Sequence, residues 1–591
     1  MNSKNAILVL LLLSYSTAGF SCGFYPFGED LRFCFLDPKS FQYGSYSEFY
    51  YTSNSFDSDT SQKKAITPNE QLWMEYCGQK VSLEATRAAL TFMPADAIRP
   101  NSPNAMVAFL YAKKDLEAVN YLRFAKECET INAGVSDVWE RGEAVSAKAA
   151  RKAIGQALRC ARTTQNPQLS RRYAFQAVRL AFYSGESESI RNIFEEFFSK
   201  GDNDILKYWS LYFNCFGQEN TALADFWAAQ VFANAPDKRF AVYNQLYDKS
   251  SLESAVQYAA SNEEKANVYV LEAVGKHFPA LVDLERIYAL DPDSEGLDFL
   301  LLREMNKIED WIFTPYYSLF NPSVNSAKLQ YDDDANSEAI LRRVESDRLY
   351  AQKVLAFVSS ANLSKVHDPM LWQSAKAELL FATMRYDEAV STVSAIEERA
   401  VKDATLYNQL QIVKALAMTA RQKPGFAVIV PEVRRILLAN STNRKFIFAV
   451  GRELENKGNT TDAALLYAAL RPEYNWEEDS RSMVFWRQKN SKSQNYYTDY
   501  YSDYFSYLNH VYTPEQVALL IADVERNKRA QAQDDFKSWL YEIANREYFA
   551  LLDLLGTKYI RRDDLASAEK TFKKIPNVLG AQLYSLGAQR E

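Results

Sequence analysis

The sequence predicts an all-α protein in which antiparallel helix pairs stack into a solenoid. The chain has 591 residues, more than a single hydrophobic core usually spans, whereas a solenoid lengthens by adding units that contact only their neighbours. Glycine and proline number only 19 and 18, too few for a sandwich or barrel with many tight turns. From residue 67 onward, apolar residues recur at helical spacing between short polar turns.

Composition also limits the partners of the chain. Apolar residues make up 47% of the sequence and supply ample material for a core. Charged residues make up 24%, the net charge is −7, and both signs are mixed throughout. Because the sequence has neither a basic stripe nor a polybasic patch, we expect no nucleic-acid partner.

The first residues predict export. A weakly basic start and an unbroken apolar run at residues 6–13 precede small residues that end at Ser21. This order is typical of a secretory signal, and the run is too short to span a bilayer. We therefore expect a signal peptide at residues 1–21 and a mature protein in the periplasm, or at the outer membrane or cell surface.

Two fates are open for Cys22, the expected first residue of the mature chain. Acylation would attach the protein to the outer membrane, although Gly19, Phe20 and Ser21 differ from the usual Leu-Ala-Gly approach. Alternatively, Cys22 and Cys34 flank a turn-rich loop and can form a disulfide in an oxidising compartment. The other four cysteines lie in helix-like segments, form no C-x-x-C pair, and are expected in the core.

The chain divides by composition into an irregular, aromatic-rich cap, three runs of helices and two insertions. Helices begin where Thr67, Pro68 and Glu70 form a capping sequence. The expected boundaries are 22–66 for the N-terminal cap, 67–310 for helical repeats, 311–337 for an acidic and aromatic loop, 338–472 for helical repeats, 473–511 for a Tyr/Trp-rich insertion and 512–591 for C-terminal helical repeats.

A repeated register supports the stacking of helix pairs. Near the C-terminus, Leu555-Gly556 and Tyr559 are followed by Ala568, Phe572, Ile575 and Pro576. This segment resembles the tetratricopeptide pattern L-G-x-x-Y, then A-x-x-x-F, then proline. Similar registers occur at Gly451–Leu470, Trp372–Ile396, Tyr208–Pro236, Tyr173–Ile193 and, more weakly, Leu271–Pro292.

The resemblance implies a tetratricopeptide-like α-solenoid and names an architecture rather than an activity. We expect each pair to cross where both helices present a small residue, with Gly556 against Ala568 and Gly451 against Ala463. Larger residues one turn along would then fill the space between the helices.

The insertion at residues 473–511 is the predicted binding surface. Tyrosine and tryptophan are enriched at binding surfaces because a rigid ring buries area while its polar edge stays wet. We expect Trp476, Trp486, Tyr497 and Tyr501 to contact the partner, with a helix aligning the tyrosines from residue 496 to 507. The alternative is that such a helix buries these rings as core.

No catalytic or metal-binding residues are predicted. The three histidines, His277, His367 and His510, are far apart, and no zinc-protease, nucleophile-elbow or phosphate-loop motif occurs. The three aspartates of residues 332–334 are adjacent, whereas a calcium loop spaces its ligands alternately. We expect no cofactor, no metal and no enzyme activity.

Two functions are compatible with the sequence. The first is an exported scaffold that binds a protein or peptide segment or assembles a cell-envelope complex. The second is a cell-surface glycan- or nutrient-binding protein similar to the starch-utilisation lipoproteins, although their N-terminal signature is not present here. The helical ring of a lytic transglycosylase is a third comparison, but the chain has no recognisable catalytic domain of that kind.

Overall fold

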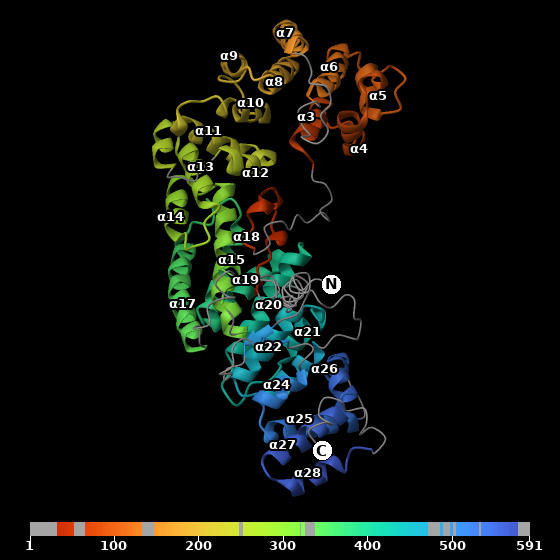
Figure 1. Ribbon diagram of the computed structural model, residues 1–591, viewed down its shortest axis with the longest axis vertical. Coiled ribbons are helices and arrows are strands. Elements are labelled where there is room, and N and C mark those ends of the chain that lie inside the picture. Colours follow the sequence, from red (N-terminus) through yellow and green to blue (C-terminus); the bar gives the residue numbers. More distant parts are fainter. Residues whose placement is uncertain are drawn as a thin grey trace, which may run out of the picture.

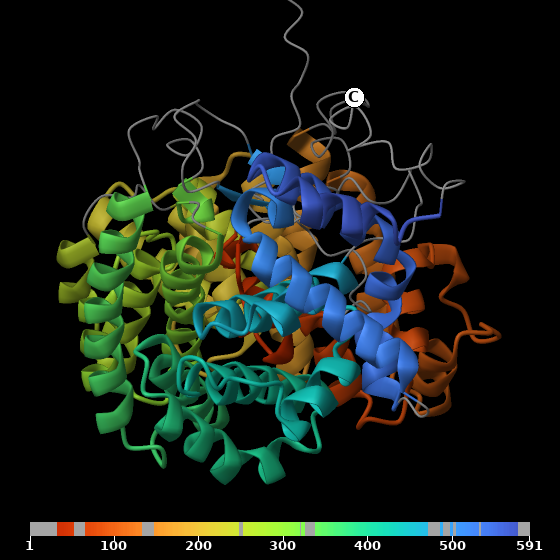
Figure 2. The same ribbon diagram turned by 90° about the horizontal axis from the view of Figure 1, so that it is seen from below.

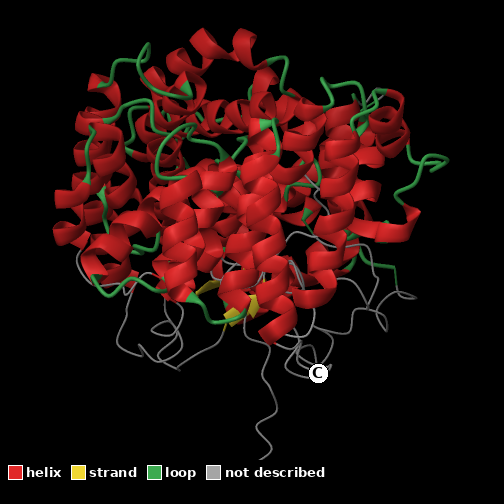
Figure 3. Ribbon diagram, turned by 90° about the horizontal axis from the view of Figure 1, so that it is seen from above, coloured by secondary structure: helices red, strands yellow, loops and turns green. Residues whose placement is uncertain are grey.

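The structure is a computed structural model that describes residues 32–52, 66–132, 147–246, 252–318, 321–325, 337–470, 485–487, 497–499, 504–530 and 534–576. Helices follow one another along a superhelical path, and consecutive helices pack as pairs (Figures 1 and 3). A short antiparallel ribbon, β1 (Phe485–Arg487) with β2 (Tyr497–Asp499), pairs Trp486 with Thr498. The predicted all-α, solenoid-like architecture is confirmed.

The helices of the first half lie in the upper part of Figure 1. They are α3 (Pro68–Tyr76), α4 (Leu83–Arg87), α5 (Ala105–Ala112), α6 (Leu116–Asn132), α7 (Ala147–Thr163), α8 (Pro167–Tyr183), α9 (Ser187–Phe197), α10 (Ile205–Cys215), α11 (Thr221–Asn234), α12 (Arg239–Ala241), α13 (Asn262–Ala273) and α14 (Leu281–Leu290).

The second half continues downward to the C-terminal helices. It contains α15 (Glu295–Ser318), α17 (Ser337–Ser360), α18 (Pro369–Ala382), α19 (Tyr386–Ala400), α20 (Ala404–Ala420), α21 (Pro431–Ala439), α22 (Arg444–Asn456), α23 (Thr460–Ala469), α24 (Tyr504–Val511), α25 (Pro514–Arg529), α26 (Asp535–Arg546), α27 (Tyr548–Arg561) and α28 (Leu565–Phe572). Short 3-10 and π turns connect them, at η1 (Pro38–Ser40), η2 (Gly44–Phe49), η3 (Ala88–Phe92), η4 (Ala95–Ala97), η5 (Pro236–Lys238), η6 (Val242–Leu246), η7 (Leu252–Tyr258) and η8 (Ser323–Asn325).

Each of the six predicted repeat segments lies on two consecutive helices that pack together: α8 with α9, α10 with α11, α13 with α14, α18 with α19, α22 with α23, and α27 with α28. The predicted helix start at Thr67 is also observed. Its hydroxyl accepts a hydrogen bond from the Glu70 amide, and the Glu70 carboxylate accepts one from the Thr67 amide, so two amides at the helix end are satisfied.

Several pairs share one turn. Three residues separate the two helices, and the middle residue has a positive φ, at Lys114, Gly185, Met384, Gly458 and Asp563. In each turn the following amide donates to the carbonyl five residues earlier, for example Arg385 to Leu380 at 2.8 Å. This is the Schellman closure of a helix C-terminus, which favours glycine because a left-handed backbone crowds other side chains. The common turn is a structural signature of the repeat.

The packing of the glycines differs from the expected small-against-small contact. A Cβ at Gly556 would clash with the ring of Phe572, and a Cβ at Gly451 would clash with the ring of Tyr467. Each glycine therefore accommodates an aromatic ring of the next helix. The ring lies one helical turn beyond the alanine that we expected to meet the glycine.

Helix α15 is buried along nearly its whole length and extends through Trp311, Phe313 and Pro315 to Ser318. The prediction that an insertion begins at residue 311 is therefore wrong for residues 311–318. Burial of the aromatic side chains stabilises the last turns of this helix despite the missing amide of Pro315. The predicted acidic residues 332–334 lie outside the described part of the chain.

Residues 32–52 are irregular, as predicted, but they do not cap an end of the solenoid. Seen along the long axis, this segment lies inside the superhelix with helices on all sides (Figure 2). It runs beside α15, and its aromatic residues Phe33, Tyr46 and Phe49 are buried. The cap prediction is corrected because these rings find their apolar surroundings among helices far along the chain.

Candidate functional site

The interior of the superhelix binds the backbone of residues 32–52. The Glu309 carboxylate on α15 accepts hydrogen bonds from the amides of Phe35 and Leu36, at 2.7 and 2.8 Å. Asn306, one turn earlier, donates to the carbonyl of Leu36 at 2.8 Å and to Glu309 at 2.9 Å. The hydroxyl of Thr314 accepts the Phe33 amide at 3.1 Å. One face of α15 therefore supplies both donors and acceptors to an extended chain.

Other helices contact the same segment from different directions. Arg239 on α12 donates to the hydroxyl of Ser45 at 2.5 Å. Gln409 on α20 donates to the hydroxyl of Ser40 at 2.5 Å, and Lys445 on α22 donates to the carbonyl of residue 32 at 2.7 Å. Helices from α12 to α22 thus converge on about twenty residues.

Aromatic contacts fix the side chains of the segment. The ring of Tyr46 stacks on Phe299 of α15, with centroids 4.3 Å apart and planes inclined by 12°. The Arg239 guanidinium lies 3.5 Å from the centroid of the Tyr46 ring on its other side. The ring centroids of Phe33 and Tyr317 are 5.2 Å apart. Such stacked and cation–π contacts add to the apolar burial of the rings.

A second buried carboxyl group lies against Glu309. Burial, with the neighbouring Glu309 carboxylate, raises the pKa of Glu378 on α18 well above its ordinary value. A raised pKa favours the neutral, protonated form of Glu378, in which it can donate its proton to the adjacent Glu309 carboxylate.

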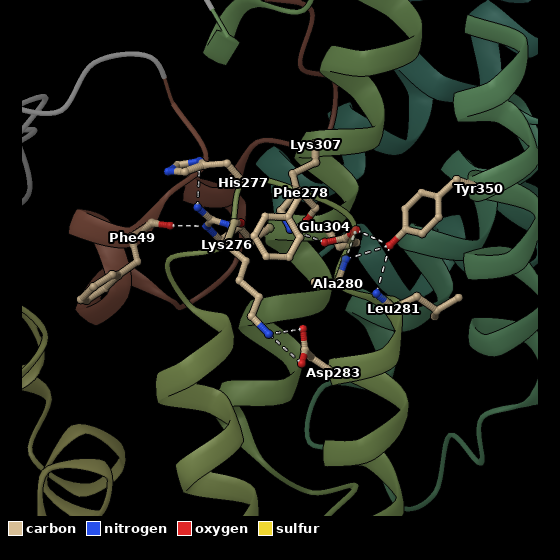
Figure 4. Close-up of polar contacts among 11 residues, drawn as sticks. Phe49, Lys276, His277, Phe278, Ala280, Leu281, Asp283, Glu304, Lys307 and Tyr350 are labelled. Atoms are coloured by element: carbon tan, nitrogen blue, oxygen red, sulfur yellow. Dashed lines mark hydrogen bonds and ion pairs between the residues drawn. The ribbon is translucent and has the colours of Figure 1, made fainter. Parts of the chain in front are cut away.

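A polar cluster closes the opposite side of α15 (Figure 4). The Glu304 carboxylate accepts hydrogen bonds from the Tyr350 hydroxyl, from Lys307 and, at 3.1 Å, from the amide of Ala280. Tyr350 also accepts the amide of Leu281 at 3.0 Å. These contacts join α14, α15 and α17, and the charge of Lys307 balances that of Glu304.

Arg303 links this cluster to the N-terminal segment. Its Nε donates to the carbonyl of Phe49 at 2.9 Å, and its guanidinium also donates to the carbonyl of Lys276. His277 lies 3.4 Å from the same guanidinium, and burial, with the Arg303 charge, lowers the pKa of His277 to about 4. His277 is therefore neutral at physiological pH, and Arg303 binds the backbone carbonyls of both Phe49 and Lys276.

The four aromatic residues predicted to bind a partner are only partly described. Trp486 lies on β1 and Tyr497 on β2, so the paired strands bring these two positions together, while β1 lies against α15. Trp476 and Tyr501 lie outside the described residues. The helix expected from residue 496 is wrong at residues 497–499, which pair as a strand, and α24 begins only at Tyr504. Alternating tyrosines and threonine suit a strand as well as a helix, which explains the error.

Among the cysteines and the remaining histidines, only Cys34 belongs to the described interior contacts. Cys34 is a free, half-buried thiol whose Sγ lies 3.5 Å from the Leu36 carbonyl oxygen. Cys22 is outside the described residues, so its lipidation stays a prediction. His367 is half-exposed near Asp293, as expected for a loop before α18. Among the described residues, no three His, Cys, Asp or Glu side chains converge as metal ligands.

Sequence reasoning missed the residues of α15 that bind the segment. Their signal was present, because α15 mixes apolar residues with charged and amide residues and has no wholly polar face, as at Asp298, Arg303, Glu304, Asn306, Lys307, Glu309 and Asp310. A helix that is apolar on every side is buried from several directions, and charges on it need buried partners. What the sequence does not indicate is that these partners come from residues 32–52.

No helix within the described ranges combines the length and the apolar character needed to cross a membrane. The chain matches no family model, no curated protein and no solved structure.

Proposed function

We propose that this chain is an exported scaffold of the tetratricopeptide type that binds a segment of a protein partner in the cell envelope. The observation that supports the proposal most directly is the seating of residues 32–52 inside the superhelix. There, fixed side chains bind backbone amides and carbonyls of an irregular segment. Concave solenoid surfaces present such side chains in rows, which suits the binding of extended protein chains.

The partner would contact surfaces that residues 32–52 leave uncovered. The aromatic insertion at residues 473–511 is the candidate from sequence, and the β1–β2 pairing supports it by bringing Trp486 and Tyr497 onto neighbouring strands. Insertions between solenoid repeats collect on one face, which is often the binding face. Export rests on the predicted signal peptide at residues 1–21, with Cys22 at or near the start of the mature chain.

Site-specific photocross-linking in the native cells tests the proposal. A photoreactive phenylalanine analogue replaces Trp486 or Tyr497, and the covalent products are identified by mass spectrometry. The matched control carries the analogue at Phe426, an aromatic residue that is 80% exposed and remote from the insertion in sequence. We expect one recurrent protein at positions 486 and 497 that is absent at 426.

Other results would reject the proposal in distinguishable ways. The same products at all three positions would mean non-specific contact. Bound oligosaccharide without a cross-linked protein would support the glycan- or nutrient-binding alternative. Cell fractionation with intact-mass measurement checks export separately, since a full-length cytoplasmic product would remove the envelope from the proposal.

A further inference from the structure

A pocket of about 310 Å³ lies on the inner face of the N-terminal helix pairs. Four helices, α3, α6, α8 and α10, supply most of its wall, and residues 32–52 are not among the described residues that line it. Aromatic side chains line the pocket together with charged and amide side chains, and the ring centroids of Trp73 and Tyr121 are 5.8 Å apart and those of Phe175 and Trp209 5.4 Å apart. The volume is at the lower end of the range for small-molecule sites.

Arg172 lines this pocket and is only 2% exposed. Its guanidinium lies 4.4 Å from the centroid of the Trp73 ring. Its Nε is buried without a hydrogen-bond partner, and among the described residues no carboxylate or other acceptor bonds to the guanidinium. A buried cation in contact with a ring but with no anion is a rare arrangement, because removing a charge from water is expensive.

The neighbouring residue, Arg171, shows which acceptors this fold provides for an arginine with a structural role. Arg171 donates to both carboxylate oxygens of Asp204, at 2.5 and 2.9 Å, and to the carbonyl of Phe197 at 3.1 Å. Asp204 is thereby occupied by Arg171. The absence of a comparable set around Arg172, within the described ranges, indicates that its partner comes from outside these residues.

The other charges of the pocket leave a positive excess. Lys126 pairs with Glu129, and Lys238 pairs with Asp237, both at 3.1 Å between nitrogen and oxygen. Arg179, two turns further along α8, also lines the pocket and has no carboxylate partner among the described residues. Two arginines therefore remain unneutralised, and burial lowers the pKa of the Arg172 guanidinium, as expected for a cation that lacks an anion.

We propose that this pocket binds a small organic anion, namely a carboxylate carried on a flat, apolar body. Arg172 binds the carboxylate through the forked geometry that suits guanidinium–carboxylate pairs. The body stacks among the rings of Trp73, Tyr121 and Trp209, where a planar apolar group gains most contact. This site is separate from the insertion at residues 473–511 and does not depend on the function proposed above.

Isothermal titration calorimetry with two matched probes tests the proposal on the full mature chain. The probes are 2-naphthylacetate and 2-naphthylacetamide, which have nearly the same shape and differ in charge. We expect the carboxylate to bind at least about tenfold more tightly than the amide, because only the carboxylate forms charge-assisted hydrogen bonds. Equal affinities, or no binding of either probe, would overturn the proposal.

Two variants locate the binding. Arg172→Gln should abolish the preference for the carboxylate, whereas Arg159→Gln, the control at an exposed position on the neighbouring helix α7, should keep it. Trp209→Leu should weaken both probes by the same factor, because it removes part of the apolar wall and leaves the arginine in place. A carboxylate preference that survives in Arg172→Gln would place the site elsewhere.

Folding and anion class are checked in parallel. Arg172 has no partner to leave unpaired, so we expect Arg172→Gln to melt at or above the temperature of the unmodified chain. If that variant does not fold, the comparison of the two probes on the unmodified chain still shows whether the protein prefers the carboxylate. Inorganic phosphate should bind at least about tenfold more weakly than 2-naphthylacetate, since it cannot use the aromatic walls. Equal binding of phosphate would contradict an apolar ligand body.

Discussion

Glu453 shows how single buried carboxyl groups link the stability of this protein to pH. It lies on α22 with 2% of its surface exposed and accepts a hydrogen bond from the Tyr317 hydroxyl at 3.0 Å. Burial raises its pKa from 4.5 to about 7, although the hydrogen bond from Tyr317 opposes the shift. The folded chain therefore binds this proton more tightly than the unfolded chain does.

The sign of the effect follows from that difference. The stabilising contribution of protonated Glu453 is complete below about pH 4.5 and is lost as the pH rises through about 7. We expect Glu453→Gln to reduce the loss of unfolding free energy between pH 4.5 and 7.5 by on the order of 3 kcal/mol. Denaturant titrations at several pH values measure this. Glu398→Gln, at an exposed position, is the charge-matched control and should leave the slope unchanged.

At the scale of the helix pair, close packing depends on glycines that face aromatic rings. Gly556→Ala places a methyl group into the ring of Phe572, so we expect a loss of about 1–3 kcal/mol in the free energy of unfolding, and a larger loss for Gly556→Leu. Thermal and denaturant unfolding measure both. Unchanged stability of both variants would mean that α27 and α28 do not pack in the assigned register.

A second helical glycine provides the control. Within the described part of the chain, and apart from the backbone of α7 itself, the only atom near a Cβ at Gly155 on α7 is the far end of the Arg159 side chain, at 4.0 Å. Gly155→Ala should therefore stabilise the chain by about 0.5–1 kcal/mol, because alanine restricts the unfolded chain and favours the helix. Opposite signs at the two glycines distinguish close packing from helix propensity.

Local sequence patterns explain why most of the helix pairs could be predicted. The spacing of small and aromatic residues located the helix pairs, and Thr67 marked a helix start that the structure confirms as a capping box. The end of α15 was not predictable in the same way, because Pro315 and a run of aromatic residues look like a loop until their burial is known. The predicted binding residues Trp476, Trp486, Tyr497 and Tyr501 all stay predictions.

At the scale of the whole molecule, residues 32–52 connect helices that a simple stack would leave independent. In a solenoid each unit contacts only its neighbours, so the array is nearly one-dimensional. Here Glu309, Arg239 and Lys445, on three different helices, all bind the same short segment. Sequence reasoning did not find this arrangement, since the contact between Lys445 and residue 32 spans 413 positions and leaves no local pattern.

Removing the central anchor tests this connection. Glu309→Ala leaves the amides of Phe35 and Leu36 buried without an acceptor, so we expect a loss of about 2–5 kcal/mol in unfolding free energy. Hydrogen exchange should show faster exchange of the amides in residues 33–51, with α8 and α9 unaffected. Glu309→Gln, which keeps an acceptor oxygen, should be milder. Undiminished protection of residues 33–51 in the alanine variant would show that Glu309 does not anchor the segment.

The position of residues 32–52 also constrains the order in which the parts of the chain can fold. This segment precedes every helix in the described chain, yet its binding surface is complete only when α22 has been formed, more than 400 residues later. Its rings also lack their contacts with Phe299 and Tyr317 until α15 has been formed, and each of these pairings requires closure of a long loop. The earliest described part of the sequence is therefore expected to be among the last to reach its native position.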